Sequence, residues 1–160
     1  MKTYPLAYHI TIHTYGTWLP GDARGWNHRG DRTRYPPSPG LEAYCKRRLR
    51  YPVVVLAAPL RELTRDAILA TCRHRSWDVH ALVVERTHIH IVIAAQDAPE
   101  RIMQTLKSWA TRVLRERGHL VDHPHPWAEH GSSEYLFATT NVQRAVGYVL
   151  DDHHRGARAE

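Results

Sequence analysis

The stretch ERTHIHIVIAA, residues 85–95, decides the fold class and raises the question of function. Side chains two residues apart in a strand share a face, so His88 and His90 point to one side of the strand and the isoleucines between and after them point to the other. The preceding segment SWDVHALVVE, residues 76–85, has the composition of another strand. The polar residues 85–87 join the two segments as a tight turn. We therefore predict a β-hairpin with one apolar face and one histidine-bearing face.

Strand-like and helix-like patterns alternate on either side of this hairpin. YHITIHTYGTW alternates as a first strand, with the isoleucines on one face and His9, Thr11 and His13 on the other. Strands and helices are predicted in the order given by residues 8–18, 59–75, 76–85, 87–95, 98–118, 134–139 and 140–154. This order, β-α-β-β-α-β followed by a C-terminal helix, predicts an α+β fold. We expect a ferredoxin-like or RRM-like antiparallel sheet with helices on one face and an additional C-terminal helix.

The helix predicted at residues 98–118 has the clearest boundaries. Asp97 is expected to cap its first turn, and Gly118 follows its last turn. Its apolar side is predicted to consist of Ile102, Leu106, Trp109, Ala110 and Val113.

Length and composition predict one domain over residues 1–160, with 42% hydrophobic residues. It carries a Gly/Pro/Arg-rich insertion at about residues 18–58, within which residues 41–50 are expected to form a short basic helix. No apolar run reaches the length of a membrane span and no signal peptide is evident, so a soluble cytoplasmic protein without a membrane partner is expected. Cys45 and Cys72 are too few and too far apart for a disulfide scaffold or a CxxC zinc motif.

The net charge favours a polyanionic partner. Lys and Arg outnumber Asp and Glu by 22 to 16, which gives +6 and a pI near 9.6. Nucleic acid is the partner that such a balance favours. A merely basic soluble protein is the alternative.

The paired histidines and the last helix carry the candidate chemistry. Two imidazoles on one strand face can bind one divalent metal, although a polar face that happens to be rich in histidine is the alternative. In the last helix, Tyr148 falls outside the apolar stripe of Val142, Val146, Val149 and Leu150, one turn before Asp152. Taken singly, Tyr148 is more often a packed edge residue and Asp152 a solvated charge. Together they fit one reaction, in which a bound metal neutralises charge on a phosphodiester and a phenol attacks its phosphorus to form a covalent phosphotyrosine.

An ordered set of motifs resembles a known family. HIH after a hairpin is the signature of the HUH nucleases, and AVGYVLDDH resembles the tyrosine helix of their single-tyrosine transposases. YHITIHTYGTWLPGDARGW, LKSWATRVLR and PWAEHGSSEYLF resemble the REP-associated tyrosine transposase group, the transposase type of the smallest bacterial insertion sequences. The resemblance extends over nearly the whole chain.

The resemblance implies a transposase that cleaves and rejoins single-stranded DNA, next to a folded hairpin, through a covalent 5′-phosphotyrosine. Tyr148 would be the nucleophile, with His88, His90 and Asp152 as ligands of Mg²⁺ or Mn²⁺. The family often has Gln where this chain has Asp152, and a carboxylate is a competent ligand for a hard cation. A homodimer and action in a bacterial cytoplasm, at the nucleoid, are also implied. A catalytically silent, domesticated nucleic-acid-binding protein of RRM-like fold is the alternative.

Several basic and aromatic residues are candidates for DNA contacts. An arginine-rich groove with aromatic stacking surfaces suits unpaired strands, whereas a flexible basic loop and a solvated lysine are the alternatives. The candidates are Lys107, Arg24, Arg29, Arg32, Arg34, Lys46, Arg47, Arg48, Trp18 and Trp26.

Three other interpretations fit the sequence less well. A two-histidine phosphoesterase needs two His-x-Thr/Ser motifs, and the chain has HIT at residues 9–11 but HIH at residues 88–90. An RNA-binding sheet needs aromatic residues on its central strands. His123, His125 and His130 lack the partnering cysteines of a zinc site.

Overall fold

The elements follow the predicted order, and the short basic helix expected at residues 41–50 is present as Pro39–Arg47. The computed structural model describes residues 3–28, 31 and 33–156, with side chains up to residue 151. The elements are β1 (Ala7–Thr14), α1 (Pro39–Arg47), α2 (Ala58–Arg75), β2 (Asp78–Val84), β3 (His88–Ala94), α3 (Pro99–Glu116), β4 (Trp127–Leu136) and α4 (Thr139–Gly156). No helix of this described part is long and apolar enough to cross a bilayer.

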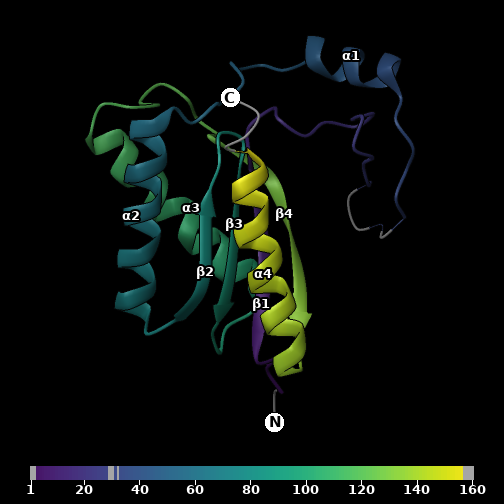
Figure 1. Cartoon of the computed structure of the whole chain (residues 1–160). Helices are drawn as coiled ribbons and strands as arrows, with labels where there is room; N and C mark the ends of the chain where they lie inside the picture. The colour runs from purple at the N-terminus through teal and green to yellow at the C-terminus, as the bar shows by residue number, and fades with distance from the viewer. Residues whose placement is uncertain (1–2, 29–30, 32, 157–160) are drawn as a thin grey trace.

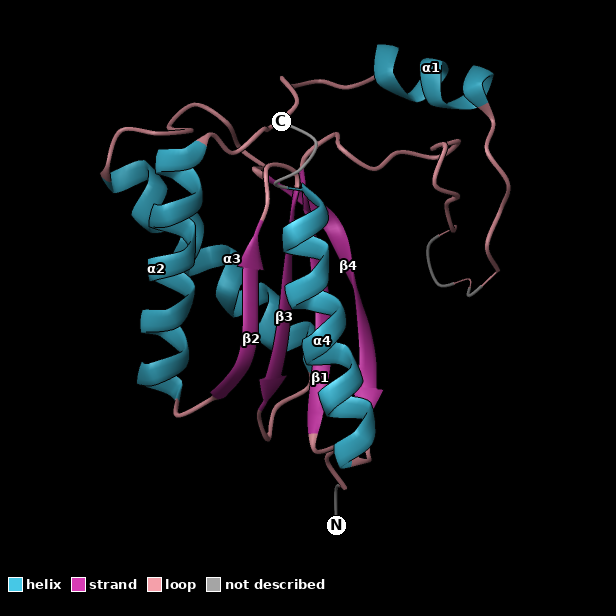
Figure 2. Ribbon diagram, in the orientation of Figure 1, coloured by secondary structure: helices cyan, strands magenta, loops and turns pink. Residues whose placement is uncertain are grey.

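The four strands form one antiparallel sheet in the order β2-β3-β1-β4 (Figure 2). The first and third strands therefore lie in the centre, which is the ferredoxin-like arrangement. The predicted α+β fold class is confirmed. β1 and β3 pair with Thr11 opposite His90 and His13 opposite His88, so the two central strands place their polar side chains together on one face.

Helices cover both faces of the sheet (Figure 1). α2 and α3 lie on the face that bears the isoleucines of β1 and β3, and Ile91, Ile93 and Leu106 are fully buried there. α4 lies across the other face, against β2 and β3. The sequence suggested that the histidine face stays open, and this was wrong: α4 covers part of it because its own apolar side needs a partner.

A second, smaller core holds α4 on the sheet. Val149 is fully buried and Ala145 is nearly so, and they pack against Ala81, Val83 and Val92. Leu150 was expected in the same stripe, but it is 49% exposed. Small side chains on both sides of this contact bring α4 close to the strands.

β4 begins seven residues before the predicted start, at Trp127 instead of residue 134. The sequence suggested a loop there because WAEHGSS has no alternation of apolar residues. β4 is an edge strand with one partner, so backbone pairing to β1 holds it without two buried faces. At Gly131 an added Cβ would lie 2.5 Å from the carbonyl oxygen of Thr11, so close pairing requires glycine here.

Two details of α3 differ from the prediction. Ala98, and not Asp97, is the N-cap residue, and the Asp97 side chain instead accepts a hydrogen bond from Trp77 Nε1 at 3.2 Å. Trp109 is 40% exposed, whereas Met103 and Leu114 are buried. The apolar side of α3 is thus rotated slightly from the predicted stripe.

Residues 15–57, here called the arm, extend beyond one end of the sheet and return to α2 (Figure 1). α1 lies at the far end of the arm and has no buried residue. The returning stretch is fixed to the sheet because Val54 N donates to the Tyr15 carbonyl and Leu56 N donates to the Arg86 carbonyl. The arm therefore starts and ends beside the strand ends that carry His13 and His88.

Candidate active site

His88 and His90 lie on the face of β3 that α4 covers. Their ring centroids are 4.9 Å apart, and His90 is 7% exposed. The alternation of β3 buries Ile89, Ile91 and Ile93 on the opposite face. The predicted orientation of the histidine pair is therefore the one observed.

β1 adds three polar residues to the same face. Thr11 Oγ1 lies 3.1 Å from His90 Nδ1, and His9 Nε2 lies 3.2 Å from the same nitrogen. The His13 ring is 5.7 Å from the His88 ring. The sequence places His9, Thr11 and His13 on one strand face but assigns them no role, because only the pairing of β1 with β3 brings them to the HIH motif. The alternating polar positions of YHITIHT were the signal available.

Burial disfavours the charged form of the β1 histidines. It is the largest of the effects that lower the pKa of His13 to about 4, and the nearby His88 and Arg24 act in the same direction. Burial also lowers the pKa of His9, against a smaller opposite effect of Glu134. Neutral imidazoles beside His88 and His90 do not repel a bound cation. His13 Nδ1 is buried and makes no hydrogen bond within the described residues.

α4 brings Tyr148 to this group. The Tyr148 ring lies 6.0 Å from the His90 ring and 5.9 Å from the His9 ring. Its neighbour Val149 is fully buried, whereas Tyr148 is 56% exposed. As predicted, Tyr148 lies outside the apolar stripe of α4. Its ring makes edge-on contacts with the two histidines, and the rest of the side chain is accessible from solvent.

The donor set at this face suits one divalent metal. Two imidazoles on neighbouring positions of one strand face can coordinate the same ion. The Asp152 side chain, the predicted third ligand, lies outside the described residues. Among the described residues no group of three His, Cys, Asp or Glu side chains is arranged to hold a metal. The histidine pair could hold such an ion only together with further ligands, which the described side chains do not group around it.

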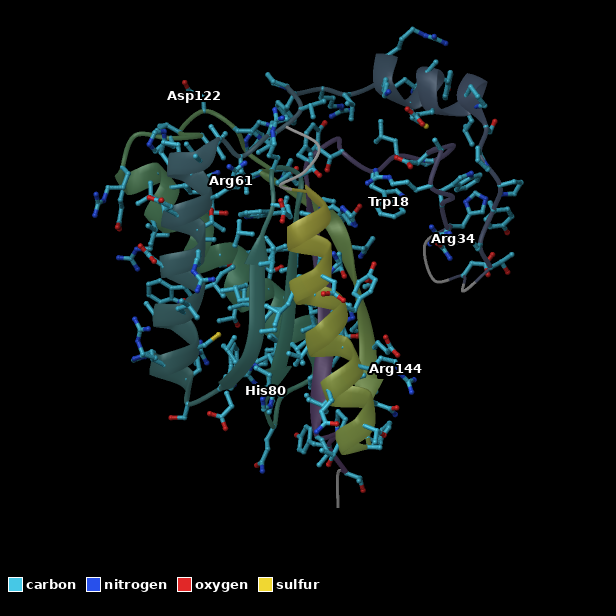
Figure 3. The ribbon with its side chains drawn as sticks, viewed as in Figure 1. Trp18, Arg34, Arg61, His80, Asp122 and Arg144 are labelled. Atoms are coloured by element: carbon cyan, nitrogen blue, oxygen red, sulfur yellow. The ribbon has the colours of Figure 1, made fainter. Side chains whose placement is uncertain are left out.

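The arm contacts the site through Trp18. The Trp18 ring packs edge-on against His13 at 4.6 Å, and Arg24 lies over it at 4.0 Å. Arg24 also forms an ion pair with Asp22 at 2.7 Å. Trp18 is half-buried, and Arg34 approaches the same ring at 5.7 Å (Figure 3).

The remaining DNA-contact candidates have different environments. Trp26 is 8% exposed and stacks on Tyr35 at 4.8 Å, so the prediction that it stacks on a base has no support in the structure. Lys107 Nζ donates to the Ala128 carbonyl at 2.9 Å, and burial lowers the pKa of Lys107. It belongs to α3, on the sheet face opposite the histidines, where it supports β4.

Exposed cations gather on and after α1. Lys46 pairs with Glu42 at 2.6 Å, Arg48 lies over the Tyr44 ring at 5.2 Å, and Arg47 is exposed. Arg29 and Arg32 lie outside the described residues.

The fold and the composition of this face define a ferredoxin-like domain with grouped histidines and a helix-borne tyrosine. Residues 45–148 match the family model described as "Transposase IS200 like". The match covers more than half of the chain, contains both histidines of HIH and ends at Tyr148. The chain belongs to the IS200-like transposase family and is therefore a DNA-processing enzyme by family. No curated protein sequence matches it.

Two solved structures share the fold. One is a REP-associated tyrosine transposase bound to a REP hairpin, with 14% identity and a TM-score of 0.54, covering 93% of this chain and 68% of that chain. The other is described as a transposase from Deinococcus radiodurans R1, with 15% identity and a TM-score of 0.54, covering 94% of this chain and 92% of that chain. At this identity they establish the fold similarity alone.

Proposed function

We propose that this protein is a metal-dependent transposase that cleaves and rejoins single-stranded DNA, with Tyr148 as the nucleophile. The observation that carries the proposal is the placement of an exposed phenol 6.0 Å, ring to ring, from His90 and on the same sheet face as His88. A tyrosine that served packing alone would not need 56% of its surface exposed beside two histidines.

His88 and His90, with Asp152 as the third ligand, would hold Mg²⁺ or Mn²⁺. When bound, the cation neutralises charge on a phosphodiester oxygen. The burial of His90 favours this role, because a buried imidazole held in one orientation loses little freedom on coordination. Asp152 follows Tyr148 by one helical turn, so helix geometry puts both on the same side of α4.

Tyr148 performs the covalent step. Its phenolic oxygen forms a bond to phosphorus as the bond from phosphorus to the 3′ oxygen breaks, and the phenolic proton passes to solvent. The 5′ phosphate then stays on Tyr148, and the leaving 3′ oxygen takes up a proton from solvent, so that the other strand end has a 3′ hydroxyl. Attack of a 3′ hydroxyl on the phosphotyrosine reverses the step and rejoins the strand without an external energy source.

The arm and α1 would hold the DNA. The exposed cations Lys46, Arg47 and Arg48, with Arg24 and Arg34 around Trp18, offer positive charge at the end of the sheet where His88 lies. We propose a single strand with an adjacent hairpin as the substrate, because the similar REP-associated transposase was solved with a hairpin. A homodimer and action in a bacterial cytoplasm are also proposed.

The test is covalent capture. The protein is incubated with labelled single-stranded oligonucleotides and Mn²⁺, and adducts are resolved on a denaturing gel. Tyr148→Phe is expected to abolish the adduct while folding and DNA binding persist, because only the attacking oxygen is removed. Tyr135→Phe is the matched control: Tyr135 is 48% exposed and packs on Tyr8, on the opposite face of the sheet.

An adduct that persists in Tyr148→Phe contradicts the nucleophile assignment. DNA binding by the wild-type protein without any adduct, on oligonucleotides with and without a hairpin, supports the catalytically silent alternative instead.

A further inference from the structure

His90 Nδ1 faces two polar groups of β1, and neither belongs to the HIH motif. Thr11 Oγ1 lies 3.1 Å away and His9 Nε2 lies 3.2 Å away. Thr11 stands directly opposite His90 in the β1–β3 register, so backbone pairing fixes this contact. Both partners approach the same nitrogen of the ring.

A neutral imidazole carries its proton on one nitrogen and coordinates a metal through the other. If Nδ1 carries the proton, Nε2 is the coordinating atom; if His9 donates to Nδ1 instead, Nε2 carries the proton and coordination fails. The hydrogen bond at the far nitrogen therefore decides whether His90 is a ligand at all.

Building on the proposed metal role of His90, we propose that Thr11 and His9 are positioning residues that hold His90 as the Nδ1–H tautomer. His90 Nδ1–H donates to Thr11 Oγ1, with His9 Nε2 as a second acceptor.

His9 has a second contact that Thr11 lacks. Its ring lies 5.3 Å from the His90 ring and 5.9 Å from the Tyr148 ring, so it contacts both the proposed ligand and the proposed nucleophile. Glu134 of β4 lies opposite His9 in the β1–β4 register. The contact of the His9 ring with Tyr148 therefore adds to the small core in positioning α4 beside the ligand pair.

The two residues thus have separable roles. Thr11 acts on the tautomer of His90 alone. His9 acts on the tautomer and also on the distance between His90 and Tyr148. His9→Phe keeps an aromatic ring at this position but removes the ring nitrogens. It should therefore weaken metal binding and leave the docking of α4 largely intact.

The first measurement uses the protein without metal. Long-range ¹H–¹⁵N NMR spectra distinguish the two tautomers of each histidine. We expect His90 to be the Nδ1–H tautomer in the wild-type protein and in Thr11→Ser, and a mixture of tautomers in the double variant Thr11→Val/His9→Phe. A wild-type His90 in the Nε2–H form overturns the inference, whatever the enzyme does with DNA.

The second measurement is Mn²⁺ affinity, followed by electron paramagnetic resonance of free Mn²⁺. Loss of a group that orients a ligand weakens metal binding by about 10–100-fold. We expect this loss of Mn²⁺ affinity in Thr11→Val/His9→Phe and wild-type affinity in Thr11→Ser, which keeps the hydroxyl. His80→Phe, at an exposed position on β2, should also have wild-type affinity (Figure 3). His88→Ala, which removes a proposed ligand, marks the full loss.

The two proposals fail differently. If Tyr148→Phe abolishes the adduct and His88→Ala abolishes Mn²⁺ binding, but the double variant keeps wild-type affinity and the wild-type His90 tautomer, the transposase proposal stands and the positioning role is wrong. If the double variant alters the tautomer but the wild-type protein forms no adduct, the positioning role stands and the catalytic proposal is wrong.

Discussion

At the scale of single residues, His13 explains why several histidines can share one sheet face. Its pKa is lowered to about 4 by burial, so the ring is neutral near pH 7 and adds no charge beside His88. Packing against Trp18 at 4.6 Å maintains this burial from the arm side. His13 therefore adds an imidazole to this face without adding positive charge, as the proposed cation site requires.

The same physical cause predicts the reactivity of the two thiols. Burial raises the pKa of Cys72 to about 11, so below that pH its thiol stays protonated and weakly nucleophilic. Cys72 is 1% exposed, whereas Cys45 lies half-exposed on α1. At pH 8 we expect an aromatic disulfide reagent to modify Cys45 in the native protein and Cys72 only after unfolding. Two thiols that react at equal rates in the native protein would contradict the buried position of Cys72.

Single residues also mark the limit of what sequence predicts. The orientation of His88 and His90 follows from the strand period of 2 in their own segment, and that of Tyr148 from the helix period of 3.6 in its segment. The structure brings the three side chains together. Thr11 and His9 belong with them only through a strand pairing that spans about 80 residues, and local periodicity does not contain that register. The sequence suggested Asp97 as a helix cap because its hydrogen-bond partner, Trp77, lies 20 residues earlier and local patterns do not reveal that contact.

At the scale of elements, the docking of α4 connects the fold to the chemistry. Small residues of α4 meet small residues of β2 and β3, and Tyr148 is placed as the neighbour of the buried Val149. The amphipathic pattern of α4 predicted an apolar side, but the sheet face that receives it could be identified only after β1, β2 and β3 were paired. The edge strand β4 was predicted too short because only its end residues, Trp127 and Leu136, are buried, so its middle shows no alternation of apolar and polar side chains.

The α4 contact can be broken without touching the site residues. Val149→Asp places a carboxylate against the small core, which is unfavourable unless α4 leaves the sheet. We expect faster hydrogen exchange in α4 and loss of the covalent DNA adduct, while β1 and β3 stay protected because their larger core does not include Val149. Leu150→Asp is the matched control at the next residue, which is 49% exposed, and should leave both readouts unchanged. Equal effects of the two substitutions would contradict the observed orientation of α4.

At the scale of the whole molecule, the proposed catalytic residues and the proposed DNA-binding residues lie in different parts, the ferredoxin-like body and the arm. The body holds the histidines and Tyr148, and the arm emerges beside them and carries α1 outward with its cations (Figure 1). The element order β-α-β-β-α-β was sufficient to predict the body. The arm was predicted only as a long insertion, because its Trp26–Tyr35 stack and Asp22–Arg24 ion pair follow no periodic pattern.

This division predicts that the DNA-binding charge belongs to the arm. Each phosphate contact that is lost reduces the slope of log affinity against log salt by about 0.7 for single strands. The triple variant Lys46→Ala/Arg47→Ala/Arg48→Ala should therefore bind single-stranded DNA more weakly at low salt, with a slope smaller by about 2 if all three contact phosphates. Fluorescence anisotropy of a labelled oligonucleotide over a salt series measures both quantities.

The control removes the same charge from the other end of the molecule. Arg73→Ala/Arg75→Ala/Arg101→Ala takes three cations from the end of α2 and the first turn of α3, away from the arm and from Tyr148 (Figure 1). It lowers the net charge equally, so a general electrostatic attraction would weaken binding in both variants alike. For a DNA strand held by α1, the salt slope decreases in the first variant and stays at the wild-type value in the second. Short-range contacts with phosphate, and not the charge of the whole protein, release the counterions.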